Sequence, residues 1–250
     1  MPDKKNRVHL NRALSKLGIL TRSQANEAIL AGRVKVNGRI VRDPAASVDP
    51  EKARFTVDGE ARRRAPWRTI LFHKPRGVVT TRSDPEGRQT IYDVIGAEAT
   101  GLRPVGRLDR ATSGVLLLTS DTGLADRLTD PANGVPRLYA VTVRGRVDDA
   151  DVEKLEHGIV DGDDDLKAES AHVRKASARE SHLMIELREG KNREIRRLCA
   201  AIGHEVTRLK RVRYGALELG DLAAGQWRAV DEEEVHRSFP EPKAHPPRKV

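Results

Sequence analysis

The chain has 250 residues and a formal net charge of +9, with 46 lysines and arginines against 37 aspartates and glutamates. This basic excess predicts a polyanionic partner such as a nucleic acid, although an aromatic content of 3% argues against a broad base-stacking platform. The chain has a single cysteine, scattered histidines, no apolar run of membrane-spanning length and no signal-peptide core. We therefore expect a cytoplasmic protein with no membrane association, no intramolecular disulfide and no metal site.

Residues 8–60 are predicted to fold as two short helices followed by a hairpin. Apolar residues at helical spacing precede Gly18, at Leu10, Ala13, Leu14 and Leu17. A second helix is predicted to begin at Thr21, because Thr21 and Gln24 have the spacing of a capping box, and to stop near Gly32. In RVKVNGRIV, residues 33–41, valines alternate with basic residues, and the Asn-Gly pair predicts a tight turn between two strands.

Basic residues dominate this first segment, where Glu27 is the only acidic residue between Asp3 and Asp43. A solvated basic face is the ordinary explanation for such charges, but the near-absence of acids favours a face that binds anions. The stretch LTRSQANEAILAGRVKVNGRIV resembles the S4 RNA-binding domain, which binds structured RNA through shape and phosphate contacts. We therefore predict an S4 domain over residues 1–61, with RNA contacts at Arg12, Lys16, Arg22, Arg33 and Lys35.

The rest of the chain is predicted to form a second domain over residues 69–238. A linker at 62–68 precedes this domain, and a disordered, basic and proline-rich tail at 239–250 follows it. Strands are expected within 69–79, 101–119, 139–147 and 183–187, with a helix from about 192 to 203 and a peripheral acidic interval at 148–180. Because strands and helices do not alternate strictly, the pattern favours an α+β fold over a doubly wound sheet.

The segment GRLDRATSG places Asp109 between Arg107 and Arg110, directly before the apolar run at 115–118. A carboxylate at the mouth of a buried strand, with cations on both sides, should stay ionised at neutral pH. An ionised carboxylate in a basic cleft can attack a substrate that is itself an anion, which favours covalent chemistry on a nucleic acid. The alternative is a loop aspartate in an ordinary surface salt bridge.

The segment REIRRLCAAIG, residues 193–203, is predicted to be an amphipathic helix with a buried stripe of Ile195, Leu198, Cys199 and Ile202. At about 100° per residue, Arg196 lies at the edge of that stripe, whereas Arg193 and Arg197 point away from it. We therefore expect Arg196 to reach into a partly buried site and the other two arginines to meet phosphates. Three solvated helix charges are the plainer alternative.

Five segments occur in an order typical of one enzyme family: HKPRGVV, GRLDRATSG, RLYAVTVRG, EGKNREIRRL and RVRYGALELGDLAAGQWRAV. With the S4-like segment they span residues 8–232 and resemble the RNA pseudouridine synthases, most closely the RsuA/RluB type that modifies ribosomal RNA. The resemblance implies a catalytic domain with a mixed, mainly antiparallel sheet behind an N-terminal S4 domain. It also implies ribosomal RNA or a pre-ribosomal particle as partner and no small-molecule cofactor, and we expect a monomer.

The resemblance assigns roles to three residues. Asp109 matches the essential aspartate and would be the nucleophile, Tyr139 matches the tyrosine that packs against the target base and helps to move its C5 proton, and Arg196 matches the basic partner of the aspartate. Pseudouridine formation breaks the N1–C1′ bond of uridine, rotates the uracil and rejoins it through C5. Attack of Asp109 on C1′ and a glycal-type elimination both stay open.

The target uridine must leave its stack to reach Asp109, which costs about a few kcal/mol. Contacts between basic side chains and RNA phosphates would offset this cost. In the second domain we predict such contacts at Lys74, Arg107, Arg110, Arg193 and Arg197.

Two positions depart from the S4-containing type. The sequence RATSG after Asp109 is more common in the RluA type. Position 194 is Glu, where the small-subunit enzyme has Gln. Both departures leave the target uridine open, while NREIRRL favours a large-subunit target. The main alternative is a non-catalytic ribosome-assembly factor of the S4 type. A glycosidase is disfavoured because the matched motifs contain no second carboxylate to accompany Asp109.

Overall fold

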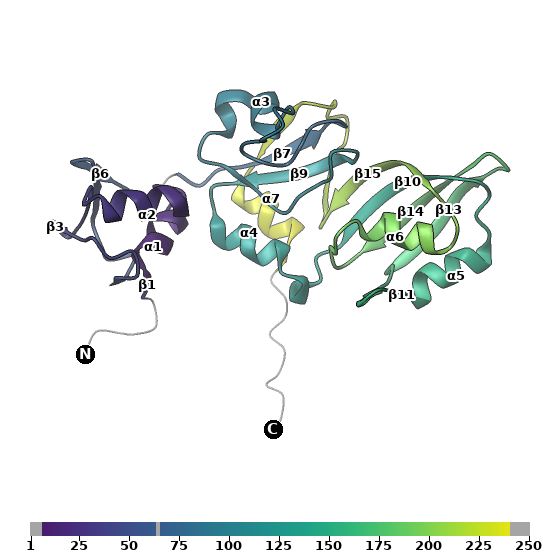
Figure 1. The fold of residues 1–250 in the computed structure, drawn as a ribbon. Helices are drawn as coiled ribbons and strands as arrows, with labels where there is room; N and C mark the ends of the chain where they lie inside the picture. Colours follow the sequence, from purple (N-terminus) through teal and green to yellow (C-terminus); the bar gives the residue numbers. More distant parts are fainter. Residues whose placement is uncertain (1–6, 64–65, 241–250) are drawn as a thin grey trace, which may run out of the picture. The chain divides into compact units, whose positions relative to one another are not determined.

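The computed structural model describes residues 7–63 and 66–240 (Figure 1). The chain divides into two compact units. The first comprises Met1–Arg68, Gly101–Arg103 and Thr119–Leu124, and the second comprises Thr69–Thr100, Pro104–Leu118 and Ala125–Val250. Residues 64 and 65 of the predicted linker and the predicted tail from 241 onward lie outside the described residues.

The first unit contains the predicted pair of helices. Helix α1 is Leu10–Lys16, and helix α2 is Arg22–Leu30. The predicted capping box is formed, because the Thr21 side chain accepts from Gln24 N while Thr21 N donates to Gln24 Oε1 (3.0 Å). These two hydrogen bonds satisfy N–H groups that a helix start leaves without intrahelical partners, so α2 begins where the sequence predicts.

The predicted hairpin belongs to a four-stranded antiparallel sheet of the first unit. Its order is β3-β2-β5-β6, and in that order the strands are Arg39–Ile40, Val34–Val36, Phe55–Val57 and Glu60–Arg62. Two further strands, β1 (Val8–His9) and β4 (Ser47–Val48), pair with each other. One apolar core joins the helices to the sheet, and Leu14, Ile29 and Val34 are completely buried in it.

The interval 62–68, predicted as a linker, has hydrogen-bonded backbone at both ends. Arg62 is the last residue of β6. Farther along, Ser120 Oγ donates to the Pro66 carbonyl (3.0 Å), and Ser120 N donates to the Arg68 carbonyl (2.9 Å). The basic composition of this interval does not indicate these contacts.

The second unit is built on a nine-stranded sheet (Figure 1). Its main path runs β13-β14-β10-β15-β9-β7-β17, with β16 beside β15 and β8 beside β9. In path order the strands are Ser170–Ala176, Glu180–Leu187, Arg137–Arg144, Val206–Tyr214, Ser113–Thr119, Thr69–Lys74 and Trp227–Val230, and β16 and β8 are Leu217–Glu218 and Arg103–Pro104. Strand β15 pairs with β9 in parallel, whereas β10, β13, β14 and β17 pair antiparallel with their neighbours. The fold is therefore α+β with a mixed sheet, as predicted.

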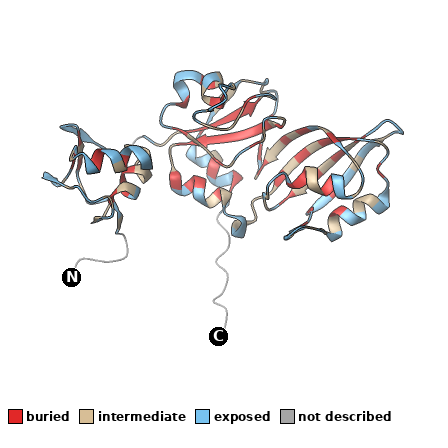
Figure 2. Ribbon diagram, in the orientation of Figure 1, coloured by how far each residue is buried: buried red, intermediate tan, exposed pale blue. Residues whose placement is uncertain are grey.

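Strands β7 and β9, toward the β17 edge of this sheet, are buried along nearly their whole length. Every residue of β7 is buried, and so are the last six residues of β9. In β14, by contrast, buried residues alternate with more exposed ones, and Leu183, Ile185 and Leu187 share the buried face as predicted. Figure 2 shows β7 and β9 in red and the strands beyond them banded. A strand covered on both faces is apolar throughout, whereas a strand covered on one face alternates.

Helices and short turns cover the sheet of the second unit. The helices are α3 Ile91–Ile95, α4 Thr122–Thr129, α5 Asp149–His157, α6 Glu194–Ala201 and α7 Glu232–Ser238, and 3₁₀ turns lie at Gly96–Ala99 and Pro131–Asn133. Helix α6 contacts β15, and α5 packs against β13. No helix in the described part of the chain is long and apolar enough to cross a membrane.

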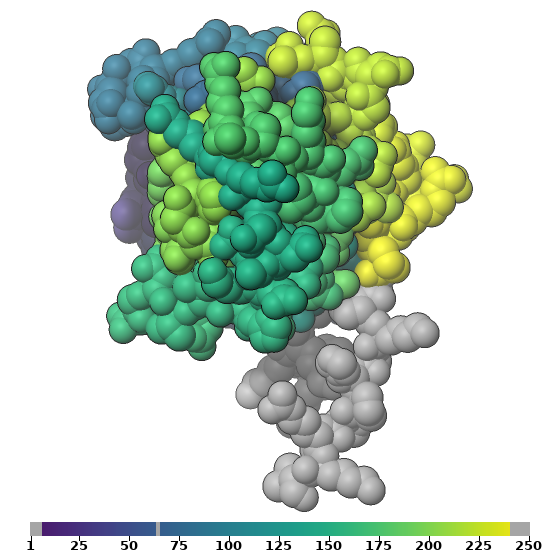
Figure 3. Space-filling model, turned by 90° about the vertical axis from the view of Figure 1, so that its right-hand side faces the viewer, coloured from purple at the N-terminus to yellow at the C-terminus, as the bar shows by residue number. Residues whose placement is uncertain are grey.

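The acidic interval 148–180, which the sequence analysis predicts to be peripheral, contributes a strand to the main sheet of the second unit. It contains α5, the hairpin of β11 (Ile159–Asp161) and β12 (Asp164–Leu166), and the edge strand β13. Figure 3 views this end of the second unit, where teal and green residues form the surface. The polar sequence of β13 reflects its position at the edge of the sheet, where one side of the strand faces solvent.

Phe239 corrects the predicted start of the tail. This residue is 3% exposed, and its ring packs edge-on against Tyr214 with centroids 5.3 Å apart. Arg127 Nη1 also donates to the Phe239 carbonyl (3.2 Å). The burial of one aromatic ring thus extends the ordered chain past α7, although the surrounding composition is polar and basic.

Candidate active site

A cavity of about 630 Å³ opens in the second unit. Its walls come from the loop after β7, the loop before β9, the neighbouring strands β10 and β15, and the turn that leads into α6. The three residues that the resemblance makes catalytic, Asp109, Tyr139 and Arg196, all line this cavity. The fold therefore brings together residues that are far apart in the sequence.

The KPRGVVT motif holds the loop that contains Asp109. Gly77 N donates to the Arg110 carbonyl (2.7 Å), and Thr80 Oγ1 donates to the Leu108 carbonyl (2.8 Å). The carbonyls on both sides of Asp109 are thus bound by one segment of the chain. Gly77 has a φ of +93°, a conformation that favours glycine and lets the backbone turn back toward the loop.

Lys74 is a structural cation of the same motif. Its side chain is completely buried, and Nζ donates to the carbonyls of Pro75 (3.1 Å), Asp109 (3.1 Å) and Thr112 (2.8 Å). Burial lowers the pKa of Lys74 from 10.5 to about 8, and the charge of Asp109 opposes this shift. A lysine bound in this way cannot reach an RNA phosphate, which corrects its predicted role.

Asp109 faces two guanidinium groups across the cavity. Its Oδ2 lies 3.9 Å from Arg193 Nη1. Arg196 is half-buried and donates from Nη1 to the Val206 carbonyl (3.1 Å), and burial lowers its pKa while the charge of Asp109 raises it. Within the described residues, the ion pair of Asp109 is therefore made by Arg193, whereas the resemblance implies Arg196.

The position of Arg193 explains why the helical wheel misplaces it. Arg193 precedes the first turn of α6 and has a left-handed backbone, with a φ of 50°. A non-glycine residue in that region needs support from its surroundings. Because α6 begins at Glu194 rather than near 192, the side chain of Arg193 is freed from the helical periodicity and reaches the cavity.

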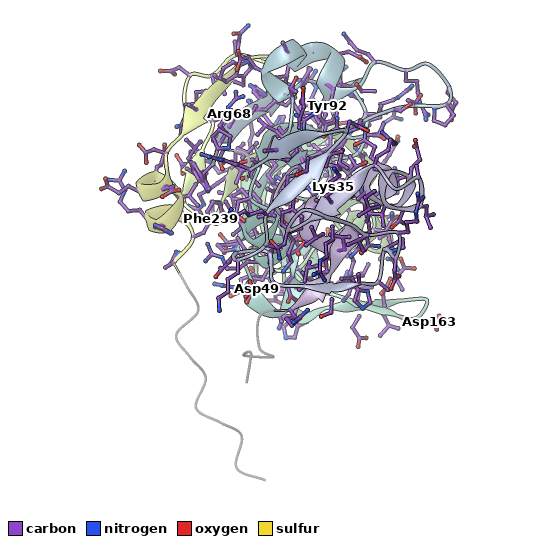
Figure 4. The ribbon with its side chains drawn as sticks, turned by 90° about the vertical axis from the view of Figure 1, so that its left-hand side faces the viewer. Lys35, Asp49, Arg68, Tyr92, Asp163 and Phe239 are labelled. Atoms are coloured by element: carbon purple, nitrogen blue, oxygen red, sulfur yellow. The ribbon has the colours of Figure 1, made fainter. Side chains whose placement is uncertain are left out.

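Arg197 is held by the acidic hairpin rather than presented to a ligand. Its Nε lies 2.5 Å from Asp161 Oδ2, and its Nη1 lies 2.7 Å from Asp164 Oδ2. Figure 4 shows Asp163 at the tip of the same hairpin, far from the labelled aromatic residues. These contacts correct the predicted phosphate contact of Arg197. The cluster of aspartates at 161–165 is the sequence signal that could have indicated a partner for this arginine.

Strands β10 and β15 form the floor of the cavity. Tyr139 is 8% exposed and pairs across the strands with Arg211, and Arg137 pairs with Tyr214. All four side chains line the cavity, although sequence reasoning singles out Tyr139 alone. Arg137 and Tyr139 are two positions apart in a strand, so their shared face was readable from RLYAVTV.

Three buried polar atoms without a hydrogen-bond partner distinguish this cavity. Within the described residues, the complete set of such side-chain atoms is Glu194 Oε1, Arg196 Nε and Arg211 Nη2, and all three residues line the cavity. Burial, with the nearby charge of Glu189, raises the pKa of Glu194 to about 7. Unpaired buried polar groups are costly, so their concentration here marks a site built for a polar ligand.

Comparisons with known proteins agree with this geometry. The RNA pseudouridylate synthase family matches residues 68–201, which is more than half of the chain, and the S4 domain matches residues 10–53. The chain belongs to the RNA pseudouridine synthase family. It is an isomerase that converts uridine in RNA to pseudouridine, and its N-terminal unit contains an S4 domain.

Relatives of this pseudouridine synthase match nearly its whole length. An uncharacterised RNA pseudouridine synthase of Aquifex aeolicus is 36% identical over 93% of this chain and 94% of the relative. Ribosomal large subunit pseudouridine synthase B of Pseudomonas aeruginosa is 39% identical over 90% of this chain, which spans 60% of that longer protein. A crystal structure of a pseudouridylate synthase superposes with a TM-score of 0.65 at 27% identity, covering 92% of this chain and 99% of the other.

The cations of the synthase's S4-containing unit differ in their exposure and in whether they form ion pairs. Arg12, Arg22 and Lys35 are exposed, and Lys16 is half-buried; Figure 4 labels Lys35 on this unit. Arg33 is also exposed, but it pairs with Glu27 (3.0 Å) and Asp58 (3.2 Å). In the second unit, Arg107 and Arg110 are exposed beside Asp109 and line the cavity. Within the described residues, no group of three or more His, Cys, Asp or Glu side chains could hold a metal ion.

Proposed function

We propose that this synthase isomerises one specific uridine of large-subunit ribosomal RNA, with Asp109 as the nucleophile. The observation that supports this proposal most directly is the position of Asp109. Its carboxylate lies 3.9 Å from Arg193 in a cavity that also contains Tyr139 and Arg196. The large-subunit substrate is inferred from the likeness to the Pseudomonas enzyme that is named for it.

Asp109 is suited to the covalent step because its carboxylate lies at the cavity beside the Arg193 guanidinium, 3.9 Å away. The side chain of Asp109 is 40% exposed, so a substrate can reach it. Either the carboxylate attacks C1′ and displaces the uracil, or it promotes a glycal-type elimination. If the carboxylate attacks C1′, the N1–C1′ bond breaks with its electron pair on the uracil, and the Asp109–C1′ ester bond breaks in turn when C5 attacks C1′, returning its electron pair to the carboxylate. In the elimination route the C2′ proton is removed as the N1–C1′ bond breaks and is returned to C2′ when C5 bonds to C1′. In both routes C5 loses its proton and N1 gains one.

Tyr139 is proposed to pack against the target base. It lies on the floor of the cavity and is almost completely buried, so its ring offers an apolar surface to a uracil that enters from above. A closed, partly apolar site would keep the detached base from escaping. The reaction is internal to the nucleotide, so we propose that the enzyme works without a small-molecule cofactor.

RNA binding is proposed to use exposed cations of both units. Near the cavity, Arg107, Arg110 and Arg193 would contact the phosphates that flank the extruded uridine. In the first unit, Arg12, Arg22 and Lys35 would contact a second region of the RNA, with Lys16 and Arg33 contributing. We further propose that the enzyme acts as a cytoplasmic monomer on ribosomal RNA or on a pre-ribosomal particle.

The test is release of tritium from C5-labelled uridine in transcripts of each ribosomal RNA, and in particles assembled on them. Wild-type enzyme should release tritium from the large-subunit substrate, and Asp109→Asn should bind that RNA with similar affinity but release none. Release from small-subunit RNA alone would overturn the substrate assignment. Activity in Asp109→Asn would overturn the role of Asp109, and binding of all substrates without release would favour the ribosome-assembly factor.

A further inference from the structure

Two arginines approach the ring of Tyr214, and their guanidinium groups differ in how many hydrogen bonds they donate. The Cζ atom of Arg137 lies 5.2 Å from the ring centroid and that of Arg211 lies 4.8 Å from it. The guanidinium of Arg137 is bound by four backbone carbonyls: Nη1 donates to those of Val135 (3.2 Å), Arg188 (3.1 Å) and Glu189 (3.0 Å), and Nη2 donates to that of Leu128 (3.2 Å). Arg137 is therefore a structural residue.

Arg211 keeps an unused donor. Its side chain is 3% exposed and its Nε donates to the Val115 carbonyl (2.7 Å), but its Nη2 is buried without a hydrogen-bond partner. A buried guanidinium N–H without an acceptor is costly, because it has lost water and gained nothing in return. Such a group persists where function requires it, and Arg211 lines the cavity that contains Asp109.

The local backbone places Arg211 at this point. Tyr139 pairs with Arg211 while Leu138 pairs with Arg213, so Val212 is an extra residue in β15 and forms a bulge. A bulge turns the side chains that follow it to the other face of the strand. As a result Arg211 and Tyr214, which are three positions apart, both line the cavity, whereas Arg213 instead binds Glu186 (2.8 Å).

A close backbone approach ties Arg211 to the loop that precedes β9. Gly114 pairs with Arg211, and a Cβ atom added to Gly114 would lie 2.1 Å from the Arg211 carbonyl oxygen. Glycine is therefore required at this position, five residues after Asp109. The contact of Arg211 Nε with Val115 and the approach at Gly114 hold the guanidinium beside the catalytic loop.

The substrate group that Arg211 fits is a carbonyl oxygen of the base. An RNA phosphate is strongly hydrated and would stay at the exposed rim of the cavity, where Arg107 and Arg110 lie. An extruded base, in contrast, enters the cavity and meets its floor. A carbonyl oxygen there would accept from a guanidinium N–H without adding a full charge to the buried site.

We propose that Arg211 donates from Nη2 to a carbonyl oxygen of the target uracil and stabilises the base while it is detached from the ribose. This inference rests on the proposed function. When the N1–C1′ bond breaks with its electron pair on the uracil, the negative charge spreads over N1, O2 and O4. Rotation about the N3–C6 axis exchanges N1 with C5 and O2 with O4, so one fixed donor serves the base before and after it turns.

The first experiment measures the single-turnover rate of tritium release from the C5-labelled RNA that the wild-type enzyme modifies. Arg211→Met keeps the length and apolar contacts of the side chain but removes the donor, and it should slow release by about 10²–10³-fold, the usual effect of losing one donor to a developing anion. Arg211→Lys should lose less, because it keeps a cation near the base. Arg213→Met, on the same strand but bound to Glu186, is the matched control and should react at the wild-type rate.

The second experiment separates contact with the base from a structural role. In an Asp109→Asn background, we would measure Kd for the target RNA and for the same RNA with an abasic ribose at the modified position. The background enzyme should bind the uridine RNA more tightly than the abasic RNA, and adding Arg211→Met should bring this ratio close to one while leaving the abasic Kd unchanged. Equal weakening of both affinities, with the ratio preserved, would overturn the proposal.

The two proposals fail in distinguishable ways. If wild-type enzyme releases tritium from no ribosomal RNA substrate, the proposed function fails before any Arg211 variant is made. If the wild type is active and the ratio of uridine to abasic affinity persists in the Arg211→Met variant, the contact with the base is wrong while the proposed function stands.

Discussion

The two units of this synthase use the same residue types for different purposes. In the first unit, Arg12, Arg22 and Lys35 stay on the surface of small helices and a short hairpin. In the second unit, Lys74 and Arg211 are buried and donate to backbone carbonyls. A cation in this basic chain can therefore be part of the fold around the cavity as well as a charge on the surface.

Backbone geometry explains this division. A loop that holds a catalytic side chain in place runs irregularly, and its carbonyls lack the partners that a helix or sheet would supply. A buried cation is itself costly unless it is hydrogen-bonded. When Lys74 donates to the carbonyls of Asp109 and Thr112, each of these costs is removed by the other group. Arg12, Arg22 and Lys35, in contrast, lie exposed on the surface of the first unit.

The largest effect is expected for Lys74→Met, which removes a completely buried cation of the second unit. Three carbonyls would lose their donor, so we expect the free energy of unfolding to fall by about 3 kcal/mol or more. Displacement of the Asp109 loop should slow tritium release by about a hundredfold or more. Lys167→Met, at an exposed position, is the control. A near-normal melting temperature and rate in Lys74→Met would show that the Asp109 loop keeps its position without the hydrogen bonds from Lys74.

The buried ammonium of Lys74 should also make the rate and the stability depend on pH. Above pH 8 the Lys74 ammonium should lose a proton and, with it, one of three donated hydrogen bonds, so the wild-type rate should fall by up to about tenfold by pH 9. The folded pKa lies below the ordinary value of 10.5, so between pH 8 and 10.5 the unfolded chain binds more protons. This group therefore makes the free energy of unfolding rise with pH in that window. Urea denaturation of wild type and Lys74→Met at pH 7 and 9.5 checks the sign, which a falling contribution would contradict.

Arg197 offers an intermediate case, since it is a cation of the second unit held by side chains instead of backbone. Arg197→Ala should release the acidic hairpin from α6 and lower the rate by about fivefold through small shifts of Arg193 and Arg196. The double variant Asp161→Asn, Asp164→Asn should have a similar effect, and combining the changes should add little. Fully additive effects would mean that the three side chains act independently.

The smallest effects are expected on the surface of the first unit. Lys35→Ala should weaken RNA binding about two- to threefold and reduce the slope of log Kd against log salt by about one, without changing the single-turnover rate. Arg33→Ala should change the slope less, because Arg33 is already paired with Glu27 and Asp58. Titrations at several salt concentrations check the ranking, and an equal or larger change in slope for Arg33→Ala would reverse it.

Local signals predicted the short-range features well. The capping box at Thr21, the hairpin at 33–41 and the shared face of Leu183, Ile185 and Leu187 depend on neighbours a few residues apart, and the structure contains all three. Predictions for single cations were less successful. Lys74 and Arg197 were predicted to contact phosphates, because a basic residue beside a motif looks the same in sequence whether its partner is RNA or a distant part of the chain.

The sequence by itself determined the family, the α+β fold class and the motif around Asp109, because these depend on residue types in a fixed order. Only the tertiary structure decided which cations surround the carboxylate. Arg193 pairs with Asp109 from the turn that precedes α6, which starts at Glu194 rather than near 192, and Arg211 reaches the cavity because of a bulge at Val212. A shift of one or two residues at a helix start or in a strand register redirects a side chain, and periodicity in the sequence does not resolve such a shift.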